Sequence, residues 1–265
     1  MRQTSDVLLL VLGSTALGLL IGSFLNVVVW RVPRGESVVR PPSACPGCRS
    51  TIAARDNVPL ISWLLLRGRC RNCAEPISSR YPLVEAGSAA LFCLMALRFG
   101  FDTVLPAFLY LAAVGLALAL IDLDCRRLPD VLTLPSYPVA LSLLGAASLF
   151  GSDSGSLLRA VFGGLAAFGL YFALCFAYPA GMGFGDVKLS GLLGLYLGWL
   201  GWGVLAVGLF LGFFLGGLFG VVLMARGRGG RKTAVPFGPF MLLGVLVAVL
   251  VGQPLVDAYL DLTGL

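Results

Sequence analysis

Apolar runs long enough to cross a lipid bilayer follow one another along most of this 265-residue chain. A helix needs about 20 apolar residues to cross the hydrocarbon core of a membrane, because each residue advances the helix by about 1.5 Å. Backbone N–H and C=O groups find no water in that core, so such runs form helices. The composition agrees, with 58% hydrophobic and only 12% charged residues. We therefore expect an all-α fold, a polytopic membrane helix bundle.

The ends of the apolar runs predict eight transmembrane helices. They lie near residues 8–30, 83–98, 104–121, 131–150, 157–178, 187–200, 204–224 and 235–252. We divide the long apolar stretch after Asp186 at residues 198–203, because its glycines and tryptophans are typical of a turn at the bilayer surface. One long tilted helix is the alternative there. The first run is longer than the apolar part of a secretory signal peptide, which indicates a retained span.

Lys and Arg residues are concentrated on alternate loops. The segment 31–82 holds nine arginines, and the segments 122–130, 181–188 and 225–233 hold two, one and four basic residues. Because Lys and Arg accumulate in cytoplasmic loops, this pattern predicts that these four segments face the cytoplasm. We expect three parts: a first transmembrane helix at 1–30, a cytoplasmic loop domain at 31–82 and a membrane bundle at 83–265.

The chain contains no histidine. Ser-His and Cys-His catalysis are therefore excluded, and so are metal sites with histidine ligands. Carboxylates and thiolates remain as the candidate reactive groups.

The segment 31–82 carries two C-x-x-C pairs, Cys45-Pro-Gly-Cys48 and Cys70-Arg-Asn-Cys73, separated by 21 residues. Four thiolates at this spacing are typical of a tetrahedral Zn²⁺ site. A reducing cytoplasm disfavours disulfides, and so short a polar loop needs a staple to fold. We favour structural zinc over iron or redox-active pairs, since four cysteines leave no position for water. The other three cysteines are interpreted as small buried hydrophobic residues: Cys93, Cys125 and Cys175.

Two acidic segments lie at predicted membrane boundaries, Ile121-Asp-Leu-Asp-Cys-Arg-Arg-Leu-Pro-Asp130 and Gly181-Met-Gly-Phe-Gly-Asp186-Val-Lys188. Ionisable groups at membrane depth are rare and mark functional sites. Two adjacent carboxylates share one proton, so the ionised one can activate water while the protonated one polarises an amide carbonyl. Asp122 and Asp186 are thus our candidate catalytic pair. The neighbours Asp124 and Asp130 suit pairing with arginine and helix capping instead.

The residues around Asp186 suggest a substrate site. Gly183 and Gly185 would let an extended substrate backbone approach the acid, although turn formation would explain them equally well. Lys188 is a candidate to contact substrate or to stabilise the charge on Asp186, and an anchor at the lipid interface is the alternative.

Several motifs resemble the prepilin peptidases, which are bacterial type IV leader peptidases of the G-x-G-D aspartyl protease class. They lie at residues 22–33, 45–48, 57–63, 70–73, 80–85, 121–130, 183–188 and 236–239. The resemblance implies catalysis by Asp122 and Asp186 at the cytoplasmic face of the bacterial inner membrane. It implies removal of the basic leader of type IV prepilins or pseudopilins, whose apolar helix would dock laterally from the bilayer. It also implies N-methylation of the new amino terminus with S-adenosylmethionine.

The resemblance places methyl transfer in the cysteine-bearing loop and the segment 80–85, with Glu85 as a candidate residue. A helix N-terminal acid stabilised by the helix dipole is the alternative for Glu85. We expect no nucleic-acid partner. Two other hypotheses remain, an ion-coupled transporter with a regulatory zinc loop and a non-catalytic pilus or secretion assembly factor. The two halves of the chain show no duplication of the kind found in many transporters.

Overall fold

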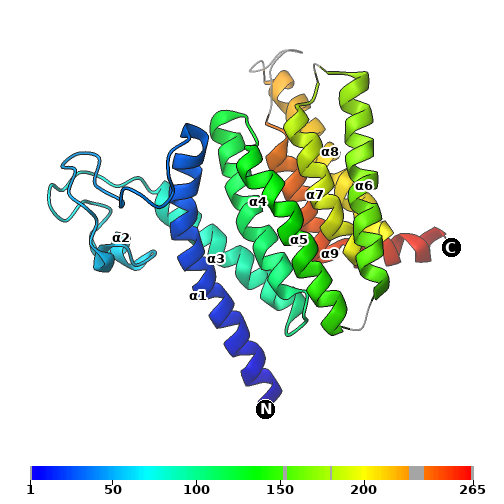
Figure 1. Cartoon of the computed structure of the whole chain (residues 1–265), viewed down its shortest axis with the longest axis horizontal. Helices are drawn as coiled ribbons and strands as arrows, with labels where there is room; N and C mark the ends of the chain where they lie inside the picture. Colours follow the sequence, from blue (N-terminus) through cyan, green and yellow to red (C-terminus); the bar gives the residue numbers. More distant parts are fainter. Residues whose placement is uncertain (1, 152–153, 180, 227–235, 264–265) are drawn as a thin grey trace. The chain divides into compact units, whose positions relative to one another are not determined.

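The computed structural model describes residues 2–151, 154–179, 181–226 and 236–263. Over these residues the chain is helical, apart from loops and two isolated β-bridges. Its long helices are α1 (Arg2–Arg31), α3 (Arg80–Phe99), α4 (Leu105–Cys125), α5 (Asp130–Gly151), α6 (Ser154–Ala177), α7 (Phe184–Leu200), α8 (Trp202–Ala225) and α9 (Gly238–Thr263) (Figure 1). They correspond one to one with the eight expected spans.

Seven helices in the described part of the chain are long and apolar enough to cross a membrane, and α7, with 17 residues, is shorter. The predicted all-α, multi-pass membrane fold is confirmed. The break between α7 and α8 falls where it was expected. Gly201 joins them with φ 153° and ψ 159°, a conformation that is essentially restricted to glycine.

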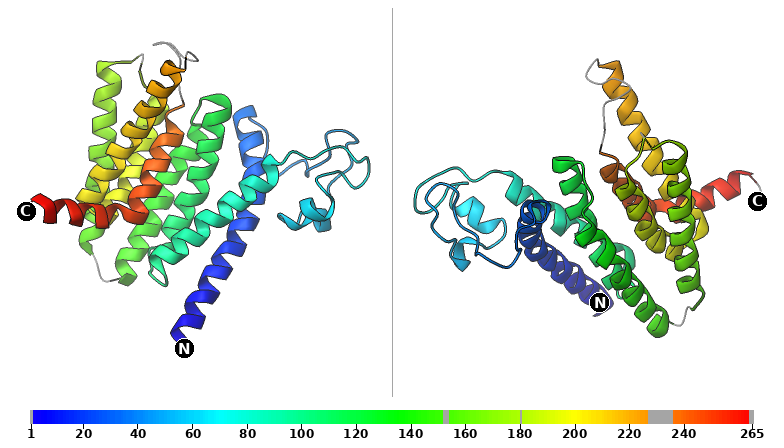
Figure 2. Two further views of the ribbon diagram at one scale, coloured as in Figure 1. Left: turned by 180° about the vertical axis from the view of Figure 1, so that it is seen from behind. Right: turned by 45° about the horizontal axis from the view of Figure 1, so that its top comes forward.

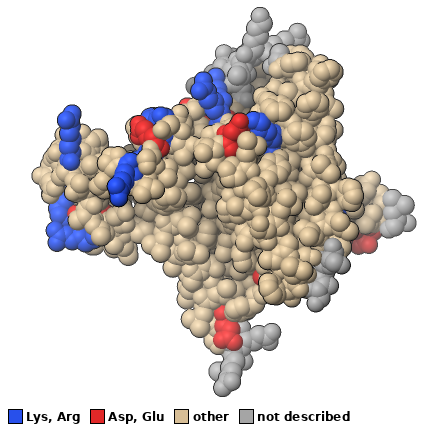
Figure 3. All heavy atoms as spheres, in the orientation of Figure 1, with Lys and Arg blue, Asp and Glu red and all other residues tan. Residues whose placement is uncertain are grey.

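Exposed apolar side chains cover much of the helical surface. Leu9 on α1 is 67% exposed and Phe210 on α8 is 64% exposed. On the face drawn in Figure 3, most of the surface over the helices carries no charged side chain. Such a surface is stable against lipid tails rather than water, which agrees with a membrane protein.

Two expectations from the sequence are corrected. Helix α9 was expected to end near residue 252 but continues to Thr263. Apolar content falls in this last part, where Gln253 donates a hydrogen bond to Asp257 one turn later. Cys125 is exposed, and Cys93 and Cys175 are only partly buried, because an apolar residue in a membrane helix can face lipid instead of the protein interior.

The chain divides into two compact units, Met1–Ala117 and Leu118–Leu265, with the boundary inside α4. In the first unit, α1 and α3 pack closely through glycines. A Cβ atom on Gly18 would lie 2.8 Å from the Cα of Ala89, and one on Gly22 would lie 2.7 Å from the Cα of Glu85. Between these helices runs the cysteine-bearing segment, with the short helices η1 (Val32–Arg34), η2 (Ala54–Asp56) and α2 (Ile61–Leu65). The expected domain boundary at residue 82 stays a prediction.

In the second unit, α7 is the central helix. It packs against α5, α6, α8 and α9, and its residues from Leu189 to Gly198 are all buried. A helix that is apolar on every face is typical of a protein interior. Helices α8 and α9 lie side by side in both views of Figure 2.

Glycines bring α6 and α7 into backbone contact. A Cβ atom on Gly194 would lie 2.6 Å from the carbonyl oxygen of Gly163, and one on Gly198 would lie 3.0 Å from the Cα of Gly163. At the end of α7, Arg159 of α6 donates hydrogen bonds to the carbonyl oxygens of Gly198 and Trp199, at 2.8 and 2.5 Å. These contacts fix α7, and with it the residues at its start.

Candidate active site and metal centre

Asp122 lies in the last turn of α4 and is only 5% exposed. Its Oδ2 atom accepts a hydrogen bond from the backbone N–H of Gly238, at 3.0 Å. Gly238 is the first residue of α9, so the carboxylate lies at the N-terminus of that helix. The positive end of the helix dipole favours a negative charge at this position.

Asp186 is the third residue of α7 and is half-buried. Its Oδ2 atom accepts a hydrogen bond from the N–H of Gly183, at 3.2 Å, and its own N–H donates to the Gly183 carbonyl oxygen, at 3.0 Å. This reciprocal pair of bonds fixes the carboxylate at the start of its helix. Gly183 is exposed and has no side chain, so it leaves the Asp186 carboxylate open on this side.

The ends of α4, α7 and α9 converge around Leu128, in the loop that follows α4. A Cβ atom on Gly185 would lie 3.1 Å from the Cβ of Leu128, and one on Gly238 would lie 3.4 Å from its Cδ2 atom. Gly185, which precedes Asp186, and Gly238, which binds Asp122, thus lie against the same residue. Two acids that are far apart in the sequence therefore lie at the same end of this unit.

Lys188 pairs with Asp130 rather than with Asp186. Its Nζ atom lies 2.7 and 2.8 Å from the two carboxylate oxygens of Asp130, the first residue of α5. The hydroxyl of Tyr137 also donates to the Lys188 carbonyl oxygen, at 2.6 Å. These bonds connect the starts of α5 and α7 beside the two acids.

The four cysteines form one cluster, whose sulfur atoms all lie within 4.8 Å of one another. The Sγ atoms of Cys45 and Cys73 are 3.7 Å apart, and those of Cys48 and Cys70 are 4.0 Å apart. Tetrahedral coordination with Zn–S bonds of about 2.3 Å places sulfurs about 3.8 Å apart. The cluster therefore fits a metal ion, as the sequence spacing predicted.

Both C-x-x-C turns have the same backbone geometry. The N–H of Cys45 donates to the carbonyl of Ser50, and that of Cys70 to the carbonyl of Glu75, at 2.9 and 2.8 Å. The fifth residue of each turn has positive φ, 57° for Arg49 and 58° for Ala74. Each turn directs both of its thiols toward the same point, so the local sequence prearranges the cluster.

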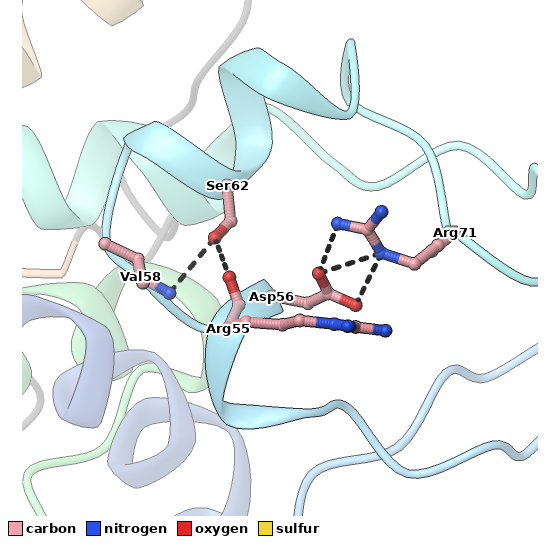
Figure 4. A network of polar contacts seen from close by, with 5 residues as sticks. All are labelled: Arg55, Asp56, Val58, Ser62 and Arg71. Carbon is pink, nitrogen blue, oxygen red and sulfur yellow. Dashed lines mark hydrogen bonds and ion pairs between the residues drawn. The ribbon is translucent and has the colours of Figure 1, made fainter.

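Polar contacts connect the second cysteine turn to the segment before α2 (Figure 4). The guanidinium of Arg71 donates to both carboxylate oxygens of Asp56, at 2.6 to 3.0 Å, and this hydrogen bonding holds the pKa of Asp56 below its ordinary value. The hydroxyl of Ser62 donates to the carbonyl of Arg55 and accepts from the N–H of Val58. The loop is therefore ordered by side chains as well as by the cysteine cluster.

Glu85 lies in the second turn of α3 and is only 8% exposed. Its Oε2 atom accepts a hydrogen bond from the N–H of Leu60, at 2.8 Å, and Leu60 has a φ of 60°. The carboxylate thus binds the residue before α2, beyond the first turn of its own helix. The cysteine cluster and Glu85 belong to the first unit, and the two aspartates belong to the second.

Comparisons with known proteins agree with this division. A family model described as the Bacterial Peptidase A24 N-terminal domain matches residues 16–99, and one described as the Type IV leader peptidase family matches residues 108–221. A prepilin leader peptidase/N-methyltransferase of Stutzerimonas stutzeri is 37% identical over 97% of this chain and 96% of its own length. The chain belongs to the type IV leader peptidase family. Relatives with the same name from Aeromonas hydrophila and Neisseria gonorrhoeae are 38% and 37% identical over 91% and 81% of this chain, and over 91% and 83% of their own lengths.

The resemblance inferred from the motifs is therefore confirmed. No solved structure matches the chain. Within this family, the first model covers the cysteine cluster and Glu85, and the second covers Asp122 and Asp186.

One contact of the site was not predicted from the sequence, the bond between Gly238 and Asp122. The Pro-Phe-Gly-Pro motif before an apolar run indicates the start of a helix. Its spacing contains no information about a carboxylate 116 residues earlier.

Proposed function

We propose that this protein is a membrane-embedded aspartyl endopeptidase that removes the basic leader of type IV prepilins or pseudopilins. The observation that carries the proposal is that the start of α7 with Asp186 and the start of α9, which binds Asp122, both lie against Leu128 at one end of the second unit. The names of the relatives, prepilin leader peptidase/N-methyltransferase, supply the substrate class.

The two acids would hydrolyse the peptide bond by general acid–base catalysis. The ionised carboxylate takes a proton from a water molecule, whose oxygen attacks the carbonyl carbon, while the protonated carboxylic acid donates a hydrogen bond to the carbonyl oxygen. When the tetrahedral intermediate breaks its C–N bond, the leaving nitrogen receives a proton from the pair. No histidine and no covalent intermediate are needed, which suits a chain without histidine.

The glycines before Asp186 would accept the substrate backbone. A Cβ atom on Gly183 would lie 3.5 Å from the Oδ2 atom of Asp186, so any side chain there would stand over the carboxylate. We propose Gly183 and Gly185 as substrate contacts. Lys188 would lie at the rim of the same site, where its pair with Asp130 fixes the start of α7.

We propose that this end of the helices faces the cytoplasm. The segments 122–130 and 181–188, which contain Asp122 and Asp186, are two of the four basic segments, which together hold sixteen of the nineteen Lys and Arg residues. The leader of a substrate would then lie in the cytoplasm while its apolar helix stays in the bilayer. The depth of the catalytic pair would select the bond that is cut.

We propose that the cysteine cluster holds structural Zn²⁺ through Cys45, Cys48, Cys70 and Cys73. The ion would supply a cross-link between the two turns of a segment that has little apolar interior. A site with four thiolate ligands has no open position, so this ion would not activate water.

We further propose that the first unit carries N-methylation, with S-adenosylmethionine as the second substrate. The methyl group would pass from the sulfonium sulfur to the new amino terminus, and the amine would lose a proton. Glu85 is a buried carboxylate next to the loop. We propose that it accepts the proton that the amine loses, or that it binds the amine.

Mass spectrometry of a co-expressed prepilin tests both activities. The proposal predicts a pilin shortened at the leader junction that is heavier by one methyl group. In the variant Glu85→Gln, which keeps the side-chain size, we expect cleavage without the methyl increment. A prepilin that retains its leader beside the wild-type enzyme would refute the peptidase assignment, and methylation by Glu85→Gln would refute the role of Glu85.

A further inference from the structure

The segment from Pro236 to Pro239 leads into α9, which begins at Gly238, and touches the candidate active site. In the first turn, the N–H groups of Phe240 and Met241 both bond to the carbonyl oxygen of Phe237, at 3.1 Å. Pro239 has no N–H, so Gly238 provides the amide of this turn that points away from its own helix. That amide donates to Asp122 at 3.0 Å.

At Gly238 the backbone of α9 also lies directly against the carboxylate. A Cβ atom there would lie 2.8 Å from the Oδ2 atom of Asp122 and 3.4 Å from its Cγ atom. The residue is helical, and its φ lies outside the left-handed region, so its backbone conformation does not require glycine. The absence of a side chain therefore serves to admit the carboxylate.

The two acids differ in their surroundings. Asp122 is almost fully enclosed and bonded to a different helix, whereas Asp186 is half-buried beside the exposed Gly183. A substrate that arrives along the glycine segment meets Asp186 first. If the substrate carbonyl lies beside that segment, Asp186 is the acid placed to polarise it, which leaves Asp122 to activate water.

We propose that Gly238 is a positioning residue of the peptidase, whose amide at the N-terminus of α9 fixes one oxygen of Asp122 and favours its ionised form. This inference rests on the proposed function. It makes Asp122 the base that takes a proton from water and leaves Asp186 to donate a hydrogen bond to the scissile carbonyl. Gly238 does not touch the substrate, so its effect is on the rate of the chemical step rather than on substrate binding.

Two substitutions distinguish the role of the Gly238 N–H group from the role of the free space beside it. Gly238→Ala keeps the N–H but adds a Cβ atom at the carboxylate, whereas Gly238→Pro removes the N–H and adds a ring whose Cδ atom takes the place of the hydrogen that points at Asp122. Gly169→Ala in α6 is the matched control, because a Cβ atom there has no neighbour within 4 Å. Each purified variant is assayed for kcat and KM of prepilin cleavage between pH 4 and pH 9, and for thermal unfolding.

We expect both Gly238 variants to lower kcat tenfold or more with little change in KM. In Gly238→Pro the acid limb of the kcat profile should also move up by about one pH unit, since a hydrogen bond to a charged group is lost. Gly169→Ala should match the wild type. If Gly238→Pro unfolds during purification, the pH profile of Gly238→Ala decides instead, because a Cβ atom 2.8 Å from Oδ2 displaces the carboxylate from the amide and should also raise the acid limb.

Wild-type kcat in Gly238→Ala would overturn the inference. So would a folded Gly238→Pro variant that loses no more activity than Gly238→Ala and keeps the wild-type acid limb, because that result indicates packing alone. Asp122→Asn in the same assay separates this failure from the larger one. If Asp122→Asn abolishes cleavage while the Gly238 variants stay normal, the inference alone fails; if Asp122→Asn still cleaves, the proposed catalytic pair fails.

Discussion

The contact between α6 and α7 should not tolerate a side chain at Gly194. A Cβ atom there would lie 2.6 Å from the carbonyl oxygen of Gly163, 2.7 Å from the Cβ of Ala167 and 2.9 Å from the Cα of Gly164. Two of these atoms are backbone, so relief requires the helices to separate. Overpacking of an interior typically costs about 1–3 kcal/mol, and we place Gly194→Ala near the upper end, at about 3 kcal/mol.

Thermal unfolding of the purified protein in detergent measures this effect. Gly169→Ala, on the partner helix α6 at a position where a Cβ atom has no neighbour within 4 Å, is the control and should be unchanged or slightly more stable, because alanine favours helix. Cleavage should fall along with stability in Gly194→Ala, since α7 carries Asp186. If Gly194→Ala unfolds at the temperature of the control, the backbone contact between these helices is wrong.

Two further predictions concern the end of α7 and the cysteine cluster. Replacing Arg159 with Met should lower the free energy of unfolding by about 2–3 kcal/mol, because it leaves the Gly198 and Trp199 carbonyls without their charged donor. Arg159→Lys keeps the charge but not the planar geometry and should recover part of the lost stability, whereas full stability of Arg159→Met would contradict the prediction. Metal analysis of the purified enzyme should find about one zinc ion per chain. The variant Cys70→Ser should lose the zinc and become sensitive to protease in the segment 31–82, whereas Cys93→Ser should keep both the zinc and the protease resistance. A zinc-free wild-type enzyme with a protease-resistant loop would count against structural zinc.

The sequence determined the helices and the cysteine turns because both are local patterns. An apolar run of about 20 residues has one stable form in lipid, and a C-x-x-C turn prearranges its own thiols. The break at Gly201 was visible for the same reason. The last part of α9 was missed because apolar content stops marking a helix once Gln253 and Asp257 appear.

Contacts between distant segments could not be predicted in this way. Hydropathy identifies a membrane helix but not the face that packs against protein, so the burial of α7 on every side emerged only from the structure. Lys188 had three plausible roles in the sequence, and Asp130, 58 residues earlier, is its partner. The acids were recognised by their place at membrane boundaries, whereas the bond from Gly238 to Asp122 depends on how α9 enters the bundle.

The rate of prepilin cleavage by purified Asp122→Asn and Asp186→Asn enzymes tests the catalytic pair most directly. Asparagine keeps the size of each side chain and can still accept the Gly238 and Gly183 amides, but it cannot ionise or share a proton. Both variants should fold like the wild type and cleave about 10³-fold more slowly or worse, while Asp261→Asn, at an exposed position of α9, should cleave normally. Wild-type cleavage by either Asp122→Asn or Asp186→Asn would contradict the account.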